Sequence, residues 1–383
     1  MRIVADENIP LLDGFFASFG DIIRMPGRAI DRAAVSDADV LLVRSVTRVS
    51  AELLAGTPVR FVGTCTIGTD HLDLAGLAAA GVRVASAPGC NARGVVEYVL
   101  SCLLTLAERT GESWWGKTVG VVGVGEVGNR LITTLEALGV RCLRCDPPRA
   151  DAGERGLIDI DQLLAEADVI SCHVPLTSEG AYPTSHLFDE QRLQALKKGA
   201  WFINSSRGPV IDNLALARVL SQRPDLQVAL DVWEYEPEVS PALAALCALA
   251  TPHIAGYSLD GKLRGTAQIY AALCDFAGEP VAVRLEALAP NAGEATWQVN
   301  PEVCADWLLA RALRWVYDVR DDDARMRHML RTAADESQRR AGFDQLRKMY
   351  PLRRETGLLA FAGSDVLPVN VQNVLLAAGF TLS

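Results

Sequence analysis

Three ionisable residues, Arg207, Glu236 and His253, each come just after a short apolar segment that is typical of a β-strand. Histidine can take up or release a proton near neutral pH, and a neighbouring carboxylate orients the ring and favours its charged form. An arginine can hold a carboxylate through two parallel hydrogen bonds. These three residue types together suit proton transfer on an alcohol that stands beside a carboxylate.

Each of the three residues also has a purely structural explanation. His253 follows Thr-Pro and could be a loop histidine, Glu236 precedes a proline and could be a turn carboxylate, and Arg207 precedes Gly-Pro. Their shared position favours the catalytic interpretation, because open α/β sheets bind ligands beyond the carboxyl ends of their strands. The remaining histidines are weaker candidates: His71 and His173 near predicted strand ends, and His186 and His328 at predicted surface or helix positions.

The elements that must position these residues form two alternating series. Apolar runs alternate with helical segments from residue 1 to about 90 and again from Lys117 onward, which predicts an α/β fold with two doubly wound, Rossmann-like parallel sheets. The predicted strands are Ile3–Ala5, Val40–Val43, Phe61–Gly63, Val82–Ala85, Thr118–Gly123, Arg141–Cys145, Val169–Cys172, Trp201–Asn204, Val228–Asp231 and about Ala248–Ala250. The predicted helices include Pro10–Phe19, Ala51–Leu54, Asn129–Leu138, Ile160–Glu166, Arg192–Leu196, Leu214–Ser221, Leu259–Ala277 and a long helix capped by Asn91.

A glycine loop, Gly123-Val-Gly-Glu-Val-Gly128, connects a predicted strand to a predicted helix. In that context Gly123 permits the tight turn, Gly125 lets the backbone approach a pyrophosphate, and Gly128 lets the helix pack on the strand. The first N–H groups of the helix, near Glu126 and Val127, would face the phosphates. The loop therefore predicts a dinucleotide site. The alternative is a tight turn in a fold that binds no nucleotide.

The next predicted strand ends at Asp146, whose carboxylate would accept hydrogen bonds from ribose hydroxyls. The same charge would repel a 2′-phosphate, which favours NAD over NADP. Arg144 and Arg149 flank Asp146 and are the opposing signal, because an arginine can accommodate that phosphate. A nicotinamide cofactor combined with the three ionisable residues indicates hydride transfer on a hydroxy acid.

Composition narrows the possible partners. The net charge of −10 argues against nucleic acid. The longest apolar stretch, Val99–Ala107, is too short to span a bilayer, and the first residues resemble a strand rather than a signal peptide, so we expect a soluble, cytoplasmic protein without a membrane partner. The nine cysteines follow no ligand or disulfide pattern, so we interpret Cys142 and Cys145 as strand residues and expect no metal site.

From residue 1 to about 277 the chain resembles the D-isomer-specific 2-hydroxyacid dehydrogenase family. The resemblance rests on Gly-Thr-Asp70-His-Leu-Asp, on Asn91-Ala through Glu97, on the glycine loop with Asp146, and on the segments that hold Arg207, Glu236 and His253. It implies NAD-dependent hydride transfer, with His253 as the proton-transfer residue, Glu236 as its partner and Arg207 as the ligand of the substrate carboxylate.

Within that family the chain most resembles members that oxidise 4-phospho-D-erythronate in pyridoxal 5′-phosphate biosynthesis. The closer match rests on the segments around Pro10, Arg44 and Tyr257 and on a C-terminal extension with Tyr350-Pro-Leu-Arg-Arg-Glu355. It implies that Ser45, Thr66 and Tyr257 contact substrate. It also implies that Asp146, Asp231 and Gly256 line the NAD site beside Glu126 and Val127. The family often has threonine where this chain has Val174, so a hydroxyl contact is lost there while backbone contacts stay available.

A substrate phosphate needs cationic partners that the three ionisable residues do not supply. Arg44 with Ser45 is the first candidate. The basic C-terminal segment around Arg347, Lys348, Arg353 and Arg354 is the second, although a solvated arginine-rich helix explains most of these residues as well.

We expect three domains. The NAD-binding domain, about 92–254, is inserted into a substrate domain of about 1–91 and 255–279, and an α+β domain of residues 280–383 forms a homodimer interface. One alternative is another small D-2-hydroxyacid dehydrogenase, such as a 3-phosphoglycerate enzyme, whose usual regulatory βαββαβ domain the C-terminal region does not match. The other is an NAD-sensing binding protein on the same fold, and the three ionisable residues count against it.

Overall fold

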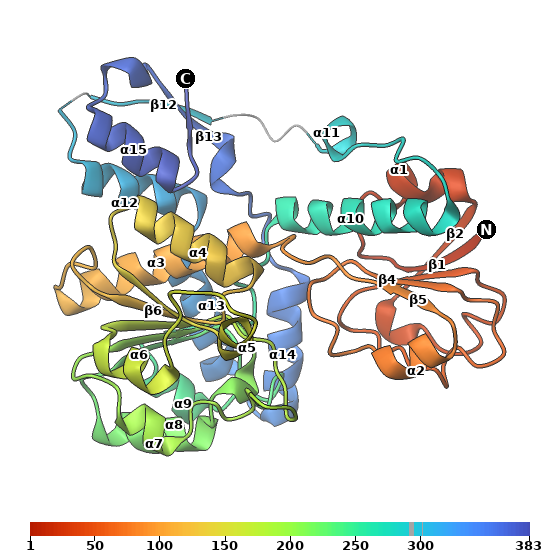
Figure 1. The fold of residues 1–383 in the computed structure, drawn as a ribbon, viewed down its shortest axis with the longest axis horizontal. Coiled ribbons are helices and arrows are strands. Elements are labelled where there is room, and N and C mark those ends of the chain that lie inside the picture. The colour runs from red at the N-terminus through yellow and green to blue at the C-terminus, as the bar shows by residue number, and fades with distance from the viewer. Residues whose placement is uncertain (291–294, 301) are drawn as a thin grey trace. The chain divides into compact units, whose positions relative to one another are not determined.

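The computed structural model of the chain describes residues 1–290, 295–300 and 302–383, and Figure 1 shows its strands and helices. The chain divides into two units. Unit 1 consists of Met1–Ala92 and Tyr257–Ala292, and unit 2 of Arg93–Gly256 and Gly293–Ser383. The expected separation of residues 280–383 as a third domain stays a prediction.

Unit 1 is built on a five-stranded parallel sheet with the order β2-β1-β3-β4-β5. The strands are β1 (Arg2–Asp6), β2 (Asp21–Met25), β3 (Val40–Val43), β4 (Phe61–Thr64) and β5 (Arg83–Ala85). The helices are α1 (Leu12–Phe16), α2 (Leu74–Ala79), α10 (Leu259–Ala277) and α11 (Leu285–Leu288). Successive residues of β1, Ile3 and Val4, belong to two different apolar clusters, because both faces of the sheet are covered. Continuous apolar runs such as β3 follow from this arrangement.

Two expectations for unit 1 were wrong. The sequence reading missed β2, because this edge strand is only half-buried and mixes charged with apolar residues. The predicted helix at Ala51–Leu54 is a series of turns. A third expectation was partly wrong: the long helix α3 (Ala92–Thr110) begins directly after Asn91, but the side-chain oxygen of Asn91 is buried and makes no hydrogen bond.

Unit 2 holds a six-stranded parallel sheet with the order β11-β10-β9-β8-β6-β7. The strands are β6 (Val119–Val122), β7 (Cys142–Cys145), β8 (Val169–Cys172), β9 (Trp201–Asn204), β10 (Gln227–Leu230) and β11 (Leu249–Ala250). The helices between them are α4 (Glu126–Ala137), α5 (Pro147–Asp151), α6 (Ile160–Glu166), α7 (Glu190–Gln194), α8 (Asn213–Gln222) and α9 (Pro241–Leu246). The predicted fold class, α/β with two Rossmann-like parallel sheets and an additional C-terminal part, is therefore confirmed.

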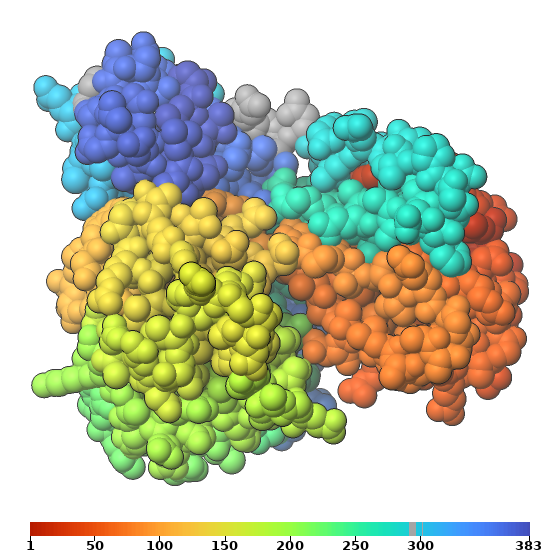
Figure 2. All heavy atoms as spheres, viewed as in Figure 1, coloured from red at the N-terminus to blue at the C-terminus, as the bar shows by residue number. Residues whose placement is uncertain are grey.

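The C-terminal residues add a third, smaller sheet of three parallel strands, β12 (Ala295–Gln298), β13 (Leu359–Ala362) and β14 (Thr381–Leu382). Their helices are α12 (Ala305–Val316), α13 (Val319–Thr332), α14 (Glu336–Lys348) and α15 (Val369–Ala377). Met326 and Phe343 lie in the same apolar cluster as the strands of the six-stranded sheet. In Figure 2 the blue C-terminal residues lie directly against the yellow residues of α4. The C-terminal region thus packs against the part of unit 2 that contains the six-stranded sheet and α4.

Among the residues that the structure describes, no helix has both the length and the apolar character needed to cross a membrane.

Candidate active site

The three ionisable residues lie in loops at the carboxyl ends of neighbouring strands of unit 2. Arg207 follows β9, Glu236 lies in the loop after β10, and His253 follows β11. These three strands are adjacent in the sheet order, and parallel strands present their carboxyl ends at one edge. The fold therefore brings loops that are far apart in the sequence to the same side of one sheet.

Glu236 and His253 form a hydrogen-bonded pair. Nδ1 of His253 lies 2.5 Å from Oε1 of Glu236, and the N–H of Trp233 donates to Oε2 at 3.3 Å. Burial raises the pKa of Glu236, but the electrostatic interaction and the hydrogen bond with His253, together with Arg347, lower that pKa more strongly. Glu236 is therefore ionised at neutral pH. Nε2 of His253 makes no hydrogen bond with any described residue, so it is available for a substrate proton.

Asp231 anchors the loop that carries His253. Its backbone carbonyl accepts the N–H of His253 at 2.7 Å. Its carboxylate accepts the N–H groups of Ile254 and Ala255 at 2.9 and 2.8 Å and the hydroxyl of Thr251 at 2.7 Å. Since Asp231 is only 1% exposed, the structure shows it as a support of the His253 loop, and its expected contact with NAD stays a prediction.

The loop of Arg207 is held just as closely. The side-chain amide of Asn204 donates to the carbonyl of Arg207 at 3.1 Å, and Nη1 of Arg207 donates to the carbonyl of Ser206 at 2.8 Å. The next residue, Gly208, packs so tightly that a Cβ there would lie 1.9 Å from the carbonyl oxygen of Trp233. A glycine is needed at this position because the loops after β9 and β10 touch backbone to backbone.

The other histidines fit an acid–base role less well. His173 contacts Ser171 at 2.9 Å, and burial lowers its pKa, so its ring is neutral at physiological pH. His186 pairs with Glu234 at 2.6 Å but is exposed, as the sequence suggested. His71 contacts Thr64 at 3.0 Å in unit 1.

The glycine loop has the geometry that a dinucleotide requires. Gly123 has φ of +90°, a left-handed conformation that favours glycine. A Cβ on Gly128 would lie 1.9 Å from the carbonyl oxygen of Gly123, so helix α4 can approach the strand only with glycine there. Beside Gly125 the space is open, and α4 begins at Glu126 without a side-chain cap, which leaves its first N–H groups for an anion.

A pocket of about 480 Å³ lies at this helix start. It is lined by Gly125, Glu126, Asn129, Arg130, Thr133, Thr134 and Arg149. Val174 lies next to the glycine loop, since its Cγ1 would be 2.9 Å from a Cβ on Gly123. Gly256 belongs to a different segment, the loop that follows His253.

Asp146 and its flanking arginines favour NAD over NADP. The carboxylate of Asp146 accepts N–H groups of Val124 at 2.8 Å and Arg149 at 3.3 Å, and it keeps acceptor capacity for ribose hydroxyls. Arg144 pairs with Glu136 at 2.7 Å and Arg149 with Glu154 at 2.6 Å. Arg144 and Arg149, which could have accommodated the 2′-phosphate of NADP, thus each form an ion pair with a carboxylate.

The residues expected to bind substrate lie in unit 1. Arg44 and Ser45 follow β3, Thr66 follows β4, and Tyr257 directly precedes the capping residue of α10. Nε of Arg44 donates to Asp6 at 3.2 Å, and the hydroxyl of Thr66 lies 2.8 Å from that of Thr64. The structure adds one residue that the sequence reading missed, Lys262, whose Nζ lies 4.7 Å from the centre of the Tyr257 ring.

Comparison with known proteins agrees with this geometry. A family model described as D-isomer specific 2-hydroxyacid dehydrogenase, NAD binding domain, matches residues 104–255. Proteins named erythronate-4-phosphate dehydrogenase in Pseudomonas savastanoi pv. phaseolicola and Pseudomonas paraeruginosa are 60% and 57% identical to the chain, and the matches cover 93% and 100% of both partners. The chain belongs to the erythronate-4-phosphate dehydrogenase family.

Two solved structures support the fold, and one of them, at 25% identity, also supports the cofactor. D-lactate dehydrogenase from Aquifex aeolicus, complexed with NAD and lactic acid, is 25% identical, with a TM-score of 0.60 over 73% of this chain and 96% of its own. For NAD⁺-bound 3-phosphoglycerate dehydrogenase from Entamoeba histolytica the identity is 23% and the TM-score 0.63, over 74% and 97% of the two chains. The chain is an NAD-dependent dehydrogenase, and the glycine loop fits that cofactor. A second family model, Domain of unknown function (DUF3410), matches residues 289–373.

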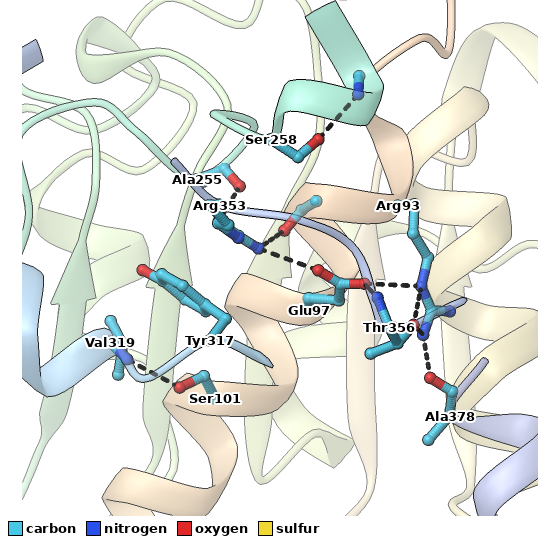
Figure 3. Close-up of polar contacts among 12 residues, drawn as sticks. Arg93, Glu97, Ser101, Ala255, Ser258, Tyr317, Val319, Arg353, Thr356 and Ala378 are labelled. Carbon is cyan, nitrogen blue, oxygen red and sulfur yellow. Dashed lines mark hydrogen bonds and ion pairs between the residues drawn. The ribbon is translucent and has the colours of Figure 1, made fainter. Parts of the chain in front are cut away.

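The C-terminal region of this dehydrogenase is bound to the start of α3 by buried polar contacts (Figure 3). Arg353 is 5% exposed; it donates to the carbonyls of Gly94 at 2.6 Å and Ala255 at 3.1 Å, and pairs with Glu97 at 3.4 Å. Its guanidinium also lies 3.6 Å from the centre of the Tyr317 ring. The alternative of a solvated helix position, which explains most of the basic C-terminal residues, does not hold for Arg353, because this residue is buried in a loop that follows α14.

Proposed function

We propose that this dehydrogenase oxidises 4-phospho-D-erythronate to (R)-3-hydroxy-2-oxo-4-phosphooxybutanoate, as a step of pyridoxal 5′-phosphate biosynthesis. The 2.5 Å contact between His253 and Glu236 carries the proposal, since it directs one ring nitrogen to the carboxylate and leaves the other for the substrate. The name that relatives at 56–60% identity share supports the choice of substrate.

The reaction removes a proton and a hydride from the same alcohol. Nε2 of His253 accepts the proton of the C2 hydroxyl, and the carboxylate of Glu236 stabilises the imidazolium that forms. NAD held at the glycine loop would supply the hydride acceptor, so that the C2–H and O–H bonds break as the carbonyl forms. Arg207 binds the neighbouring C1 carboxylate through paired N–H groups and polarises the C2 oxygen.

The remaining expected site residues complete the proposal. Ser45, Thr66 and Tyr257 would contact substrate. The cofactor would be held by the glycine loop with Asp146, and additionally by Val174, Asp231 and Gly256.

A substrate panel tests the proposed function. Purified protein is mixed with NAD and with 4-phospho-D-erythronate, 3-phosphoglycerate or D-lactate, and the absorbance of the reduced nicotinamide is followed through a single turnover. We expect NAD reduction to be at least about tenfold faster with 4-phospho-D-erythronate than with the other two acids. A site that pairs with the polar groups of one acid discriminates against acids whose polar groups are placed differently. NAD reduction with 3-phosphoglycerate and none with 4-phospho-D-erythronate would contradict the proposed function and indicate a 3-phosphoglycerate dehydrogenase instead.

We also propose that the dehydrogenase is a homodimer formed through residues 280–383. Large apolar side chains are exposed in the described part of this region: Trp307, Trp315, Met349, Leu352, Val366, Val369 and Leu376. Exposed apolar surface of this kind typically marks an interface with another protein. Sedimentation of the protein at micromolar concentration should give the mass of two chains, and a single-chain mass would reject the dimer.

A further inference from the structure

In unit 1 an arginine, Arg44, lies at the point where the order of the strands in the sheet reverses. The chain places β2 on one side of β1, and then continues with β3, β4 and β5 on the other side. Asp6 ends β1 and Arg44 follows β3, so both residues lie at the carboxyl ends of the two strands that flank this switch point. Open α/β sheets bind ligands in the crevice at such a point.

The guanidinium of Arg44 is anchored through its Nε. Its Nε donates to Oδ2 of Asp6 at 3.2 Å, while Oδ1 of Asp6 accepts the backbone N–H of Asn8 at 2.8 Å and its side-chain amide at 3.2 Å. Asp6 is fully buried, which gives Arg44 a rigid support. The two terminal nitrogens of Arg44 make no hydrogen bond with the described residues, and they form the pair of donors that suits an oxyanion.

Lys262 places a second positive charge beside the strand end that precedes Arg44. Gly265, one turn further along α10, packs so closely that a Cβ there would lie 2.8 Å from the carbonyl oxygen of Cys65, and the N–H of Cys65 donates to the carbonyl of Val43 at 2.9 Å. Lys262 lies in the first turn of α10, whose N-terminal end favours anions, and its Nζ is 4.7 Å from the centre of the Tyr257 ring. Within the part of the chain that the structure describes, no carboxylate forms an ion pair with this ammonium. Burial lowers the pKa of Lys262, and the positive charge of Arg44 lowers it further.

Two neighbouring cations without a counter-ion for the ammonium are unfavourable in a half-buried setting. The arrangement stands out because the chain as a whole has a net charge of −10. A bound dianion would offset the repulsion between the two cations. Its hydrogen bonds would also replace the contacts with water that burial has removed from them. The site is therefore suited to a doubly charged oxyanion rather than to a neutral group.

We propose that Lys262 and Arg44 bind the phosphate of the substrate, with Asp6 as the residue that positions Arg44. This assignment rests on the proposed function, and it names the chemical class that unit 1 recognises, a phosphomonoester dianion. Each terminal nitrogen of Arg44 donates to one phosphate oxygen, and the ammonium of Lys262 donates to a third.

Lys262→Met tests the assignment in the full-length enzyme. The variant keeps an unbranched side chain over Tyr257 and loses the charge. We expect kcat/KM for 4-phospho-D-erythronate to fall about 10- to 100-fold, the typical effect of one charged hydrogen bond, while the much lower value for unphosphorylated D-erythronate stays unchanged. The matched control is Lys198→Met, which removes an exposed lysine of unit 2 and should leave both values unchanged.

A titration with inorganic phosphate, followed by calorimetry, gives a readout that does not depend on turnover. Wild-type enzyme and the Lys198→Met control should bind phosphate, and Lys262→Met should bind it about 10- to 100-fold more weakly. Equal losses with both substrates, or unchanged phosphate binding in Lys262→Met, would overturn the assignment. If wild-type enzyme does not oxidise 4-phospho-D-erythronate, the proposed function fails, and the phosphate titration then decides the anion site by itself.

Discussion

His253→Asn should lower kcat for NAD reduction by about 10²- to 10⁴-fold, the usual contribution of a general acid or base, while NAD affinity stays within about twofold. Asparagine is the informative substitution because His253 has φ of +57°, a left-handed conformation that asparagine tolerates and alanine does not. The amide can also still donate a hydrogen bond to Glu236. The variant therefore removes proton transfer with little strain on the loop.

The chain supplies a matched control for this substitution. His186 also has a left-handed backbone, with φ of +49°, and also pairs with a glutamate, since its Nε2 lies 2.6 Å from Glu234. His186→Asn should keep kcat within about twofold, because the exposed His186 lies outside the proposed site. Single-turnover absorbance measures the chemical step, and calorimetric titration measures NAD affinity. Wild-type kcat in His253→Asn would remove His253 from the mechanism, and loss of NAD binding would indicate a structural role instead.

Arg353→Met should lower the free energy of unfolding by about 3 kcal/mol or more, because it breaks a buried ion pair from one side. The carbonyls of Gly94 and Ala255 would lose their donor, and Glu97 would keep only Arg93, at 3.1 Å, and the N–H of Thr356, at 2.8 Å. Methionine preserves most of the apolar stem. The loss therefore reports the charge and its hydrogen bonds rather than a large cavity.

Urea denaturation measures the free energy of unfolding of Arg353→Met and of two further variants. Arg331→Met changes an exposed arginine of the same C-terminal region and should alter stability by no more than about 0.5 kcal/mol. Adding Glu97→Gln to Arg353→Met should lower the stability further, since Glu97 would otherwise still pair with Arg93 at 3.1 Å. A stability of Arg353→Met equal to that of the Arg331→Met control would show that the buried contacts do not hold the C-terminal region in place.

The sequence reading worked best where the signal is local. Strands such as β3, β8 and β9 are buried along their whole length and are apolar except for Ser171 and Asn204, and their bounds were predicted to the residue. The placement of Arg207, Glu236 and His253 after strands follows from the same kind of apolar segment. Weak local signals failed: β2 at a half-buried sheet edge was missed, and Ala51–Leu54 has helical composition but forms turns.

The sequence by itself determined the fold class, the glycine loop with Asp146, and the identity of the three ionisable residues, because each depends on residues close together in the chain. Only the tertiary structure decided that Glu236 is bonded to His253, that Arg353 is buried against Glu97, and that α10, which carries Lys262, packs on β4 beside the strand that Arg44 follows. These pairs join residues distant in sequence. Their meeting depends on strand order and helix packing, which no local pattern of residues encodes.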